Sequence, residues 1–213
     1  MSDLNKRILS SLILISMTLL ALYNYYILTI ILLLLFIEIY NEIFLILKRI
    51  FKKKIKLYLS LLFSLVYLLV LIMSTWLIFT DSFSQFKVYF LVIVLICVSS
   101  DIGGYVFGKT IGGKKLTKIS PNKTYSGSIG SYFLSIIFTF LIFNNYFSSE
   151  FIILYSITIS TISQIGDLMI SNLKRKANIK DTGNLLPGHG GLLDRFDGLI
   201  FAIPSGLIIL NFL

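Results

Sequence analysis

The sequence predicts an all-α integral membrane protein, a polytopic bundle of about seven transmembrane helices with a polar active site on its cytoplasmic side. Of its 213 residues, 56% are hydrophobic and 14% charged, and the mean hydropathy of +0.90 exceeds that of soluble domains. Apolar runs that could cross ~30 Å of hydrocarbon at ~1.5 Å per residue recur along the whole chain. Most charged side chains gather in short segments between these runs.

Seven apolar runs account for the predicted helices: 8–23, 25–47, 57–80, 88–107, 129–143, 151–170 and 199–213. The first and last are shorter than the ~20 residues that a transmembrane helix needs, so either could be tilted, interfacial or paired as a tight hairpin. Asn24 is expected to form the turn between the first two runs. Residues 1–23 also have the basic start and apolar centre of a signal peptide, but they lack a small-residue cleavage site.

Positive charge alternates between the predicted loops. Lys and Arg number two at the amino terminus, six in 48–56, five in 109–123 and five in 174–195, and only Lys87 lies in another connection. This alternation follows the positive-inside rule and predicts a cytoplasmic amino terminus and an outside carboxyl terminus. Topology and contact with anionic headgroups therefore explain the net charge of +9, and we expect no nucleic-acid partner.

Carboxylates inside the apolar runs are the first candidates for function, because an ionisable group in hydrocarbon usually faces a cavity or a partner. Asp101 follows two serines in the fourth run and shares a helix face with Tyr105, four residues on. A purely structural aspartate is the alternative. Glu38 and Glu42 are also four residues apart. Glu38 fits a functional cavity, whereas Glu42 could simply reach the basic loop at 48–56.

The segment 107–130 is rich in groups that bind phosphate. It contains glycines, five lysines, hydroxyl side chains and Pro121. A helix that begins near Ser126, Gly127 or Ser128 would direct its amino-terminal N–H groups at an anion. The spacing matches no Walker loop and so does not by itself indicate a nucleotide. A solvated cytoplasmic loop is the alternative.

Two polar clusters flank the next loop. Gln164, Asp167 and Ser171 recur at helical spacing on one face, and Lys174 with Arg175 follows one to two turns later, which suits a metal-bridged phosphate. The second cluster consists of Asp194 and Asp197. It follows the segment PGHGG, which contains His189.

Asp194 and Asp197 are three residues apart, so in a helix their carboxylates would repel each other unless a cation lay between them. Such hard oxygen ligands favour Mg²⁺. The PGHGG segment has too many glycines for a helix, and we expect a loop in which backbone amides and His189 contact a substrate. A structural role is the alternative for this lone histidine.

These residues resemble the signature of the CDP-diacylglycerol synthases, also called phosphatidate cytidylyltransferases. The residues that match with the correct spacing are Ser171, Lys174, Arg175, Lys180, Asp181, Gly183, Leu186, Pro187, Gly188, His189, Gly190, Gly191, Asp194, Arg195, Phe196 and Asp197. Residues 101–130 resemble the second conserved block of that family, and Glu38 matches a glutamate of its early helix. The sequence departs from the family at Asn122, usually lysine, and at Ser126, usually glutamate.

The resemblance implies that CTP and phosphatidic acid are converted to CDP-diacylglycerol and pyrophosphate in phospholipid biosynthesis. Residues 81–213 would form the catalytic transmembrane region with the signature at 171–197, and residues 1–80 the amino-terminal helices with their basic cytoplasmic loop. The implied catalytic residues are Asp167, Lys174, Arg175, Lys180, Asp181, His189, Asp194, Arg195 and Asp197. The implied substrate contacts are Asp101, Tyr105, Lys123, Ser126, Ser171, Gly188, Gly190 and Gly191. Asp167, Asp194 and Asp197 would bind Mg²⁺, with a monovalent cation such as K⁺ as a further option.

Other functions would use a similar membrane core. A CDP-archaeol synthase is one alternative, and a CTP-dependent polyprenol kinase, which transfers the γ-phosphate and releases CDP, is another. A transporter would more often show repeated halves or broken helices, and the sequence shows no internal repeat. The expected partners are CTP, phosphatidic acid and membrane lipids, with a homodimer as an open alternative. We expect the protein in a bacterial inner membrane, with the active site facing the cytoplasm.

Overall fold

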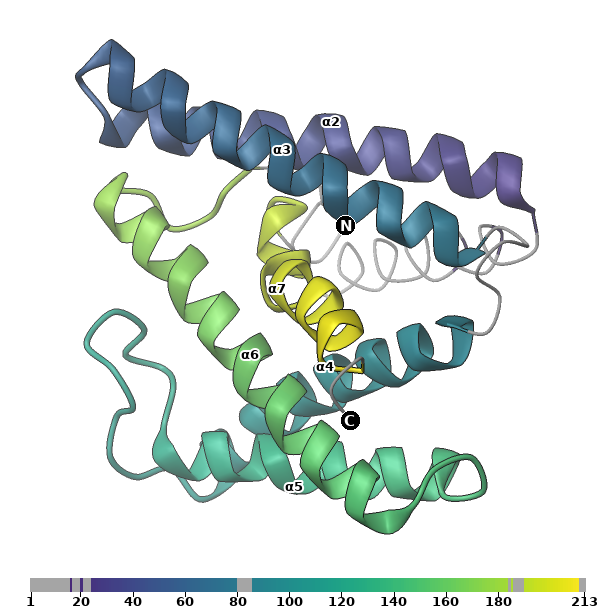
Figure 1. Ribbon diagram of the computed structural model, residues 1–213. Coiled ribbons are helices and arrows are strands. Elements are labelled where there is room, and N and C mark those ends of the chain that lie inside the picture. Colours follow the sequence, from purple (N-terminus) through teal and green to yellow (C-terminus); the bar gives the residue numbers. More distant parts are fainter. Residues whose placement is uncertain are drawn as a thin grey trace. The chain divides into compact units, whose positions relative to one another are not determined.

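The computed structural model describes residues 16, 20, 24–79, 86–183, 185 and 190–210. The predicted all-α fold is confirmed, because named helices hold most of these residues (Figure 1). The helices are α2 (Tyr25–Ile50), α3 (Lys54–Phe79), α4 (Lys87–Thr110), α5 (Tyr125–Phe143), α6 (Ser149–Lys176) and α7 (Leu193–Ile209).

Five helices, α2 to α6, are long and apolar enough to cross a membrane. They coincide with the second to sixth predicted runs, and most continue past the apolar run into flanking polar residues. Almost all of the first predicted run lies outside the described residues. Helix α7 begins at Leu193, six residues before the predicted run, and its 17 residues do not place it among the five. The count of seven spans therefore stays a prediction.

The chain divides into two compact units, and each is described by itself. The first comprises Met1–Ser84 with Leu173–Phe196, and the second comprises Gln85–Asn172 with Asp197–Leu213. This grouping places the loop between α6 and α7 with the amino-terminal helices, whereas the sequence suggested a division near residue 80. Helices α6 and α7 each run from one unit into the other.

In the first unit, α2 and α3 pack side by side as a hairpin joined by residues 51–53 (Figure 1). Asn24 caps α2, because its side chain accepts a hydrogen bond from the Tyr26 N–H at 2.8 Å. The indole N–H of Trp76 donates to Thr29 Oγ1 at 2.9 Å and so ties α3 to α2. Large apolar side chains such as Phe63, 74% exposed, point away from the pair, as expected where acyl chains are the solvent.

In the second unit, small residues bring α4, α5 and α6 close together. Ser131 Oγ of α5 donates to the Ser100 carbonyl of α4 at 2.7 Å, and the Ser100 hydroxyl lies 2.9 Å from that of Ser160 in α6. Gly103 in α4 meets the backbone of Gly130 in α5. Such close approach and hydroxyl hydrogen bonding hold helices together where lipid removes the hydrophobic driving force.

Replacing Gly103 with alanine is expected to destabilise the second unit. The added Cβ would overlap the carbonyl oxygen of Gly130, and backbone cannot move aside as a flexible side chain can. We expect a loss of ~1–3 kcal/mol, measured as a lower midpoint of thermal unfolding in detergent. Ile102→Ala, at an exposed neighbouring position, should leave the midpoint nearly unchanged, and equal midpoints for the two variants would contradict the close packing.

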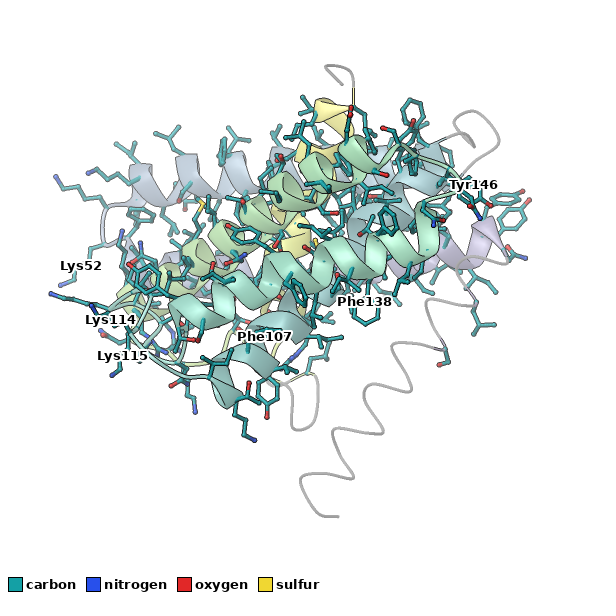
Figure 2. The ribbon with its side chains drawn as sticks, turned by 90° about the horizontal axis from the view of Figure 1, so that it is seen from below. Lys52, Phe107, Lys114, Lys115, Phe138 and Tyr146 are labelled. Carbon is teal, nitrogen blue, oxygen red and sulfur yellow. The ribbon has the colours of Figure 1, made fainter. Side chains whose placement is uncertain are left out.

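The connection between α4 and α5 is an ordered basic loop. Its two arms pair through a bridge between Lys115 and Thr124, and the Thr124 side chain caps α5 by accepting from the Gly127 N–H at 3.1 Å. Figure 2 shows Lys114 and Lys115 beyond the start of α5 and Tyr146 beyond its other end. The predicted helix start near Ser126 is thus confirmed within a few residues, and the lysines gather at one end of this unit.

Candidate active site

In the second unit, Asp167 is the centre of a polar cluster on α6. Its carboxylate forms a salt bridge with Lys123, and it accepts a hydrogen bond from Ser171 Oγ at 3.2 Å. One turn earlier, Gln164 Oε1 accepts from Ser128 Oγ of α5 at 2.6 Å. The predicted polar face of α6 is therefore confirmed, and it lies against the start of α5, where Lys123 supplies a cation.

Asp197, near the start of α7, belongs to the same unit and interacts with Asp167. Burial raises the pKa of the Asp197 carboxyl well above its ordinary range, and the charges of Asp167 and Asp101, with a hydrogen bond to Asp167, raise it further. A cluster of like charges that raises the pKa of one of its carboxyls is a setting in which a bound cation is stabilising. The cluster lies beside Lys123, which already offsets part of the negative charge.

The donor set fits Mg²⁺ in part. Among the described residues, no group of three or more His, Cys, Asp or Glu side chains is arranged to hold a metal ion. Mg²⁺ commonly takes only one or two carboxylates and completes its shell with water and substrate phosphate oxygens. The neighbouring carboxylates of Asp167 and Asp197 satisfy that smaller requirement.

In the first unit, Asp194 is held by a second set of contacts. Its Oδ1 accepts from Lys174 Nζ at 2.6 Å. Its Oδ2 accepts from the N–H of Thr182 at 2.8 Å, from the N–H of Gly191 at 3.2 Å and from Thr182 Oγ1 at 3.1 Å. Both oxygens are thus already engaged. Metal binding by Asp194 would require Lys174 to release Oδ1. The role of Asp194 as a metal ligand therefore stays a prediction.

These contacts set the charge of Asp194. Burial alone would raise its pKa, but the hydrogen bond and charge of Lys174, with the N–H groups of Thr182 and Gly191, lower it below the ordinary value of 3.8. Asp194 is therefore ionised at neutral pH and balances Lys174. Their side chains are only 13% exposed for Lys174 and 8% for Asp194, so water does little to screen the pair.

Glu42 is the residue of this region that the sequence misled us about. The sequence left open that it could reach the basic loop at 48–56, but the contacts of its carboxylate lie in the loop before α7 and at the start of that helix. Its side chain is buried, 2% exposed, and accepts hydrogen bonds from Thr182 Oγ1 and from the N–H groups of Leu192 and Leu193. Two glycines lie against the carboxylate: a Cβ on Gly183 would stand 2.7 Å from Glu42 Oε1, and one on Gly191 2.5 Å from either oxygen. In the sequence, the only sign of such a role for Glu42 was its helical spacing from Glu38, which places the two on one face of the helix.

The remaining predicted residues fall into three groups. Arg175, Lys180, Asp181 and Arg195 are exposed in the first unit, where ligands can reach them. In the second unit, Asp101 and Tyr105 are exposed on α4, while Ser126 donates to the Gly112 carbonyl and so helps to close the basic loop. Gly188 and His189 lie outside the described residues, whereas Gly190 and Gly191 precede α7.

In the first unit, a cavity of about 390 Å³ opens between α2 and the loop that follows α6. Glu38, Asn41 and Arg49 line it from α2, and Asp181 lines it from the loop. Its volume is in the range of pockets that bind small molecules. The prediction that Glu38 faces a cavity is confirmed, and Arg49 is a lining residue to which the sequence analysis gave no such role.

Comparisons with known proteins identify the family of this sequence. The model of the cytidylyltransferase family matches residues 2–213. A phosphatidate cytidylyltransferase of Rickettsia bellii is 45% identical over 126 residues, which cover 54% of this chain and 54% of the relative. One of Staphylococcus aureus is 42% identical over 136 residues, covering 62% and 52%, so the chain spans about half the length of the curated relatives it matches. A family model that matches nearly every residue shows that this chain belongs to the cytidylyltransferase family.

Proposed function

We propose that the protein is a phosphatidate cytidylyltransferase that converts CTP and phosphatidic acid to CDP-diacylglycerol and pyrophosphate. The observation that carries the proposal is the cluster of Asp167, Asp197 and Lys123 at the polar face of α6. It combines hard oxygen donors for a divalent cation with a fixed positive charge for phosphate. The names of the relatives supply the substrate class.

The chemistry needs charge neutralisation more than a strong base. The phosphate monoester of phosphatidic acid has a second pKa near ~6, so most of it is a dianion at neutral pH and can attack the α-phosphorus of CTP directly. The new P–O bond forms as the bond to pyrophosphate breaks. The protein must hold the two substrates in line and offset the negative charge of the transition state.

The proposed roles follow the contacts. Asp167 and Asp197 would hold Mg²⁺, which when bound neutralises phosphate charge, and Asp194 stays a predicted third ligand. Lys123 would exchange its salt bridge with Asp167 for a contact to phosphate. The exposed cations of the first unit would bind the triphosphate and the leaving pyrophosphate: Arg175, Lys180 and Arg195. Lys174 keeps Asp194 ionised and in place.

The test of this function is product analysis with purified protein in detergent. Given labelled CTP, phosphatidic acid and Mg²⁺, the protein should form labelled CDP-diacylglycerol and release pyrophosphate. A CTP-dependent lipid kinase would instead release CDP and leave the cytidine label in water-soluble product. Turnover of an archaeal ether lipid phosphate alone would favour the CDP-archaeol synthase alternative. No turnover of any lipid phosphate would contradict the proposal.

Arg195→Lys is expected to lower kcat/KM at least ~10-fold. Lysine keeps the charge but loses the planar fork that fits two phosphate oxygens, and a tenfold loss corresponds to ~1.4 kcal/mol in the transition state. The control is the triple change of Lys52, Lys53 and Lys54 to glutamine, in the hairpin loop of the first unit and at the first residue of α3. Rates per folded molecule should stay within a few-fold in this control. A dead control beside a normal Arg195→Lys enzyme would show that the phosphate site lies elsewhere.

The proposed orientation places the amino terminus, the loop at 51–53 and the basic loop at 111–124 in the cytoplasm of a bacterial cell. In a Cys97→Ser background, single cysteines at Lys53 and Lys115 should be protected from a membrane-impermeant thiol reagent in intact cells. A cysteine at Asn145, after α5, should be labelled. Labelling of Lys53→Cys and Asn145→Cys from the same side would overturn the orientation and the odd number of spans between them.

A further inference from the structure

The carboxylate of Glu42 is buried, 2% exposed, and is held by hydrogen-bond donors of the loop before α7 and of the start of that helix. It accepts three hydrogen bonds: from Thr182 Oγ1 at 2.5 Å, from the Leu192 N–H at 2.8 Å and from the Leu193 N–H at 2.9 Å. The two N–H groups belong to the start of α7, where helical N–H groups have no partner within the helix and the helix dipole favours a negative charge. Glu42 thus caps α7 from a helix that precedes it by about 150 residues.

Thr182 connects this cap to Asp194. Its hydroxyl lies between the two carboxylates, 2.5 Å from Glu42 Oε2 and 3.1 Å from Asp194 Oδ2, and its N–H also donates to Asp194. The Gly191 N–H completes the set of donors to Asp194. Every group in this series of hydrogen bonds is buried or half-buried. The donors to Oδ2 hold the Asp194 carboxylate in one orientation, in which Oδ1 is directed at Lys174.

We propose that Glu42 is a positioning residue for the reaction: it acts through Thr182 and the start of α7 to fix Asp194. This inference rests on the proposed function, because it assigns a role in the same nucleotidyl transfer. Glu42 does not touch the reacting atoms. Its removal should therefore lower kcat by loosening the geometry and should change the KM for either substrate much less.

The direct test is Glu42→Gln. The carboxamide keeps the size but has one acceptor and one donor end, so its NH₂ group must face an N–H of α7 that already donates. We expect kcat to fall at least ~10-fold with both KM values within ~3-fold. The matched control is Glu150→Gln, the same chemical change at an exposed position in the first turn of α6, and its kcat should equal that of the unchanged protein.

A double-mutant cycle separates positioning from general loss of structure. Thr182→Val removes only the hydroxyl that joins Glu42 to Asp194, and it should lower kcat by itself. If Glu42 acts through Thr182, the double variant should be little worse than Glu42→Gln alone, because both changes break one chain of contacts. Two effects that multiply in full would overturn the inference. If Glu42→Gln does not fold, Thr182→Val decides the matter, and a normal kcat there would overturn it.

Limited trypsin digestion gives a readout that does not depend on turnover. Lys180 is exposed and lies two residues before Thr182, so loosening of the loop should speed cleavage after Lys180 in Glu42→Gln and not in Glu150→Gln. Equal cleavage rates would overturn the inference even if kcat fell. The two proposals can also fail separately. If the unchanged protein makes no CDP-diacylglycerol, the proposed function is contradicted. Faster cleavage in Glu42→Gln than in Glu150→Gln would then still show that Glu42 holds the loop.

Discussion

Asp197→Asn should reduce kcat at least ~100-fold, about 2.7 kcal/mol of transition-state stabilisation, while the protein stays folded. The amide oxygen of asparagine is a weaker Mg²⁺ ligand, and the negative charge that attracts the ion is lost. Folding should survive, because burial and the charge of Asp167 already raise the pKa of Asp197 and favour its neutral form in this cluster. The measurement is turnover of CTP at saturating Mg²⁺, with thermal unfolding recorded in parallel.

Two controls accompany this variant. Asp81→Asn makes the same chemical change in the connection between the third and fourth predicted runs, outside the family motif, and should leave turnover unchanged. EDTA should abolish the activity of the unchanged protein, and added Mg²⁺ should restore it. Ordinary turnover in both Asp197→Asn and Asp167→Asn would show that these two carboxylates do not bind the metal.

Lys174→Met is expected to cost about 3 kcal/mol in the free energy of unfolding and to reduce turnover ~100-fold or more. Methionine keeps much of the length of the side chain, but Asp194 then remains charged in a site where it is 8% exposed and has no cation. Removal of one member of a buried ion pair typically costs ~3–5 kcal/mol. Because the pKa of Asp194 is lowered, the stability that its ionised form contributes is complete above its ordinary value of 3.8 and is lost only as the pH falls through the lowered pKa.

The double variant Lys174→Met with Asp194→Asn distinguishes stability from activity. Without the unpaired charge, most of the lost free energy of unfolding should return, because the N–H groups of Thr182 and Gly191 can still donate to the asparagine oxygen. Turnover should remain low, since both side chains that we place in the site are gone. A double variant that is no more stable than Lys174→Met alone would show that the pair is not the origin of the loss.

Helix positions and the polar face of α6 could be predicted from the sequence because they depend on local patterns. Hydropathy gave five of the spans, and the spacing of Gln164, Asp167 and Ser171 gave one helix face. The last predicted run began only at residue 199, and the sequence left open whether Asp194 and Asp197 share a helix; α7 contains both. The family motif marked Gly183 and Gly191 without giving their structural reason, which is the buried side chain of Glu42.

The role of Glu42 could not be predicted, because nothing local distinguishes it from Glu38. Both lie in the second half of the same apolar run, and contact with the lysines at 48–56 was one interpretation that the sequence left open for Glu42. What decides the outcome is a distant loop that brings two N–H groups and a hydroxyl to one of the two carboxylates. The salt bridge between Lys174 and Asp194 was missed for the same reason: each was assigned separately to phosphate or metal, and only tertiary structure pairs them.

The hydrogen bonds of Glu42 also set an order in which parts of the protein can fold during synthesis. At ~5–20 residues per second, a ribosome needs roughly 8–30 s to pass from Glu42 to its partners about 150 residues later. Throughout that interval the nascent helix carries an acidic side chain with none of its final donors, among some of the most apolar sequence in the chain. The loop before α7 cannot reach its final contacts until Leu192 and Leu193 have been made. A chain that stops before Leu192 would therefore leave the Glu42 carboxylate without both of its backbone donors.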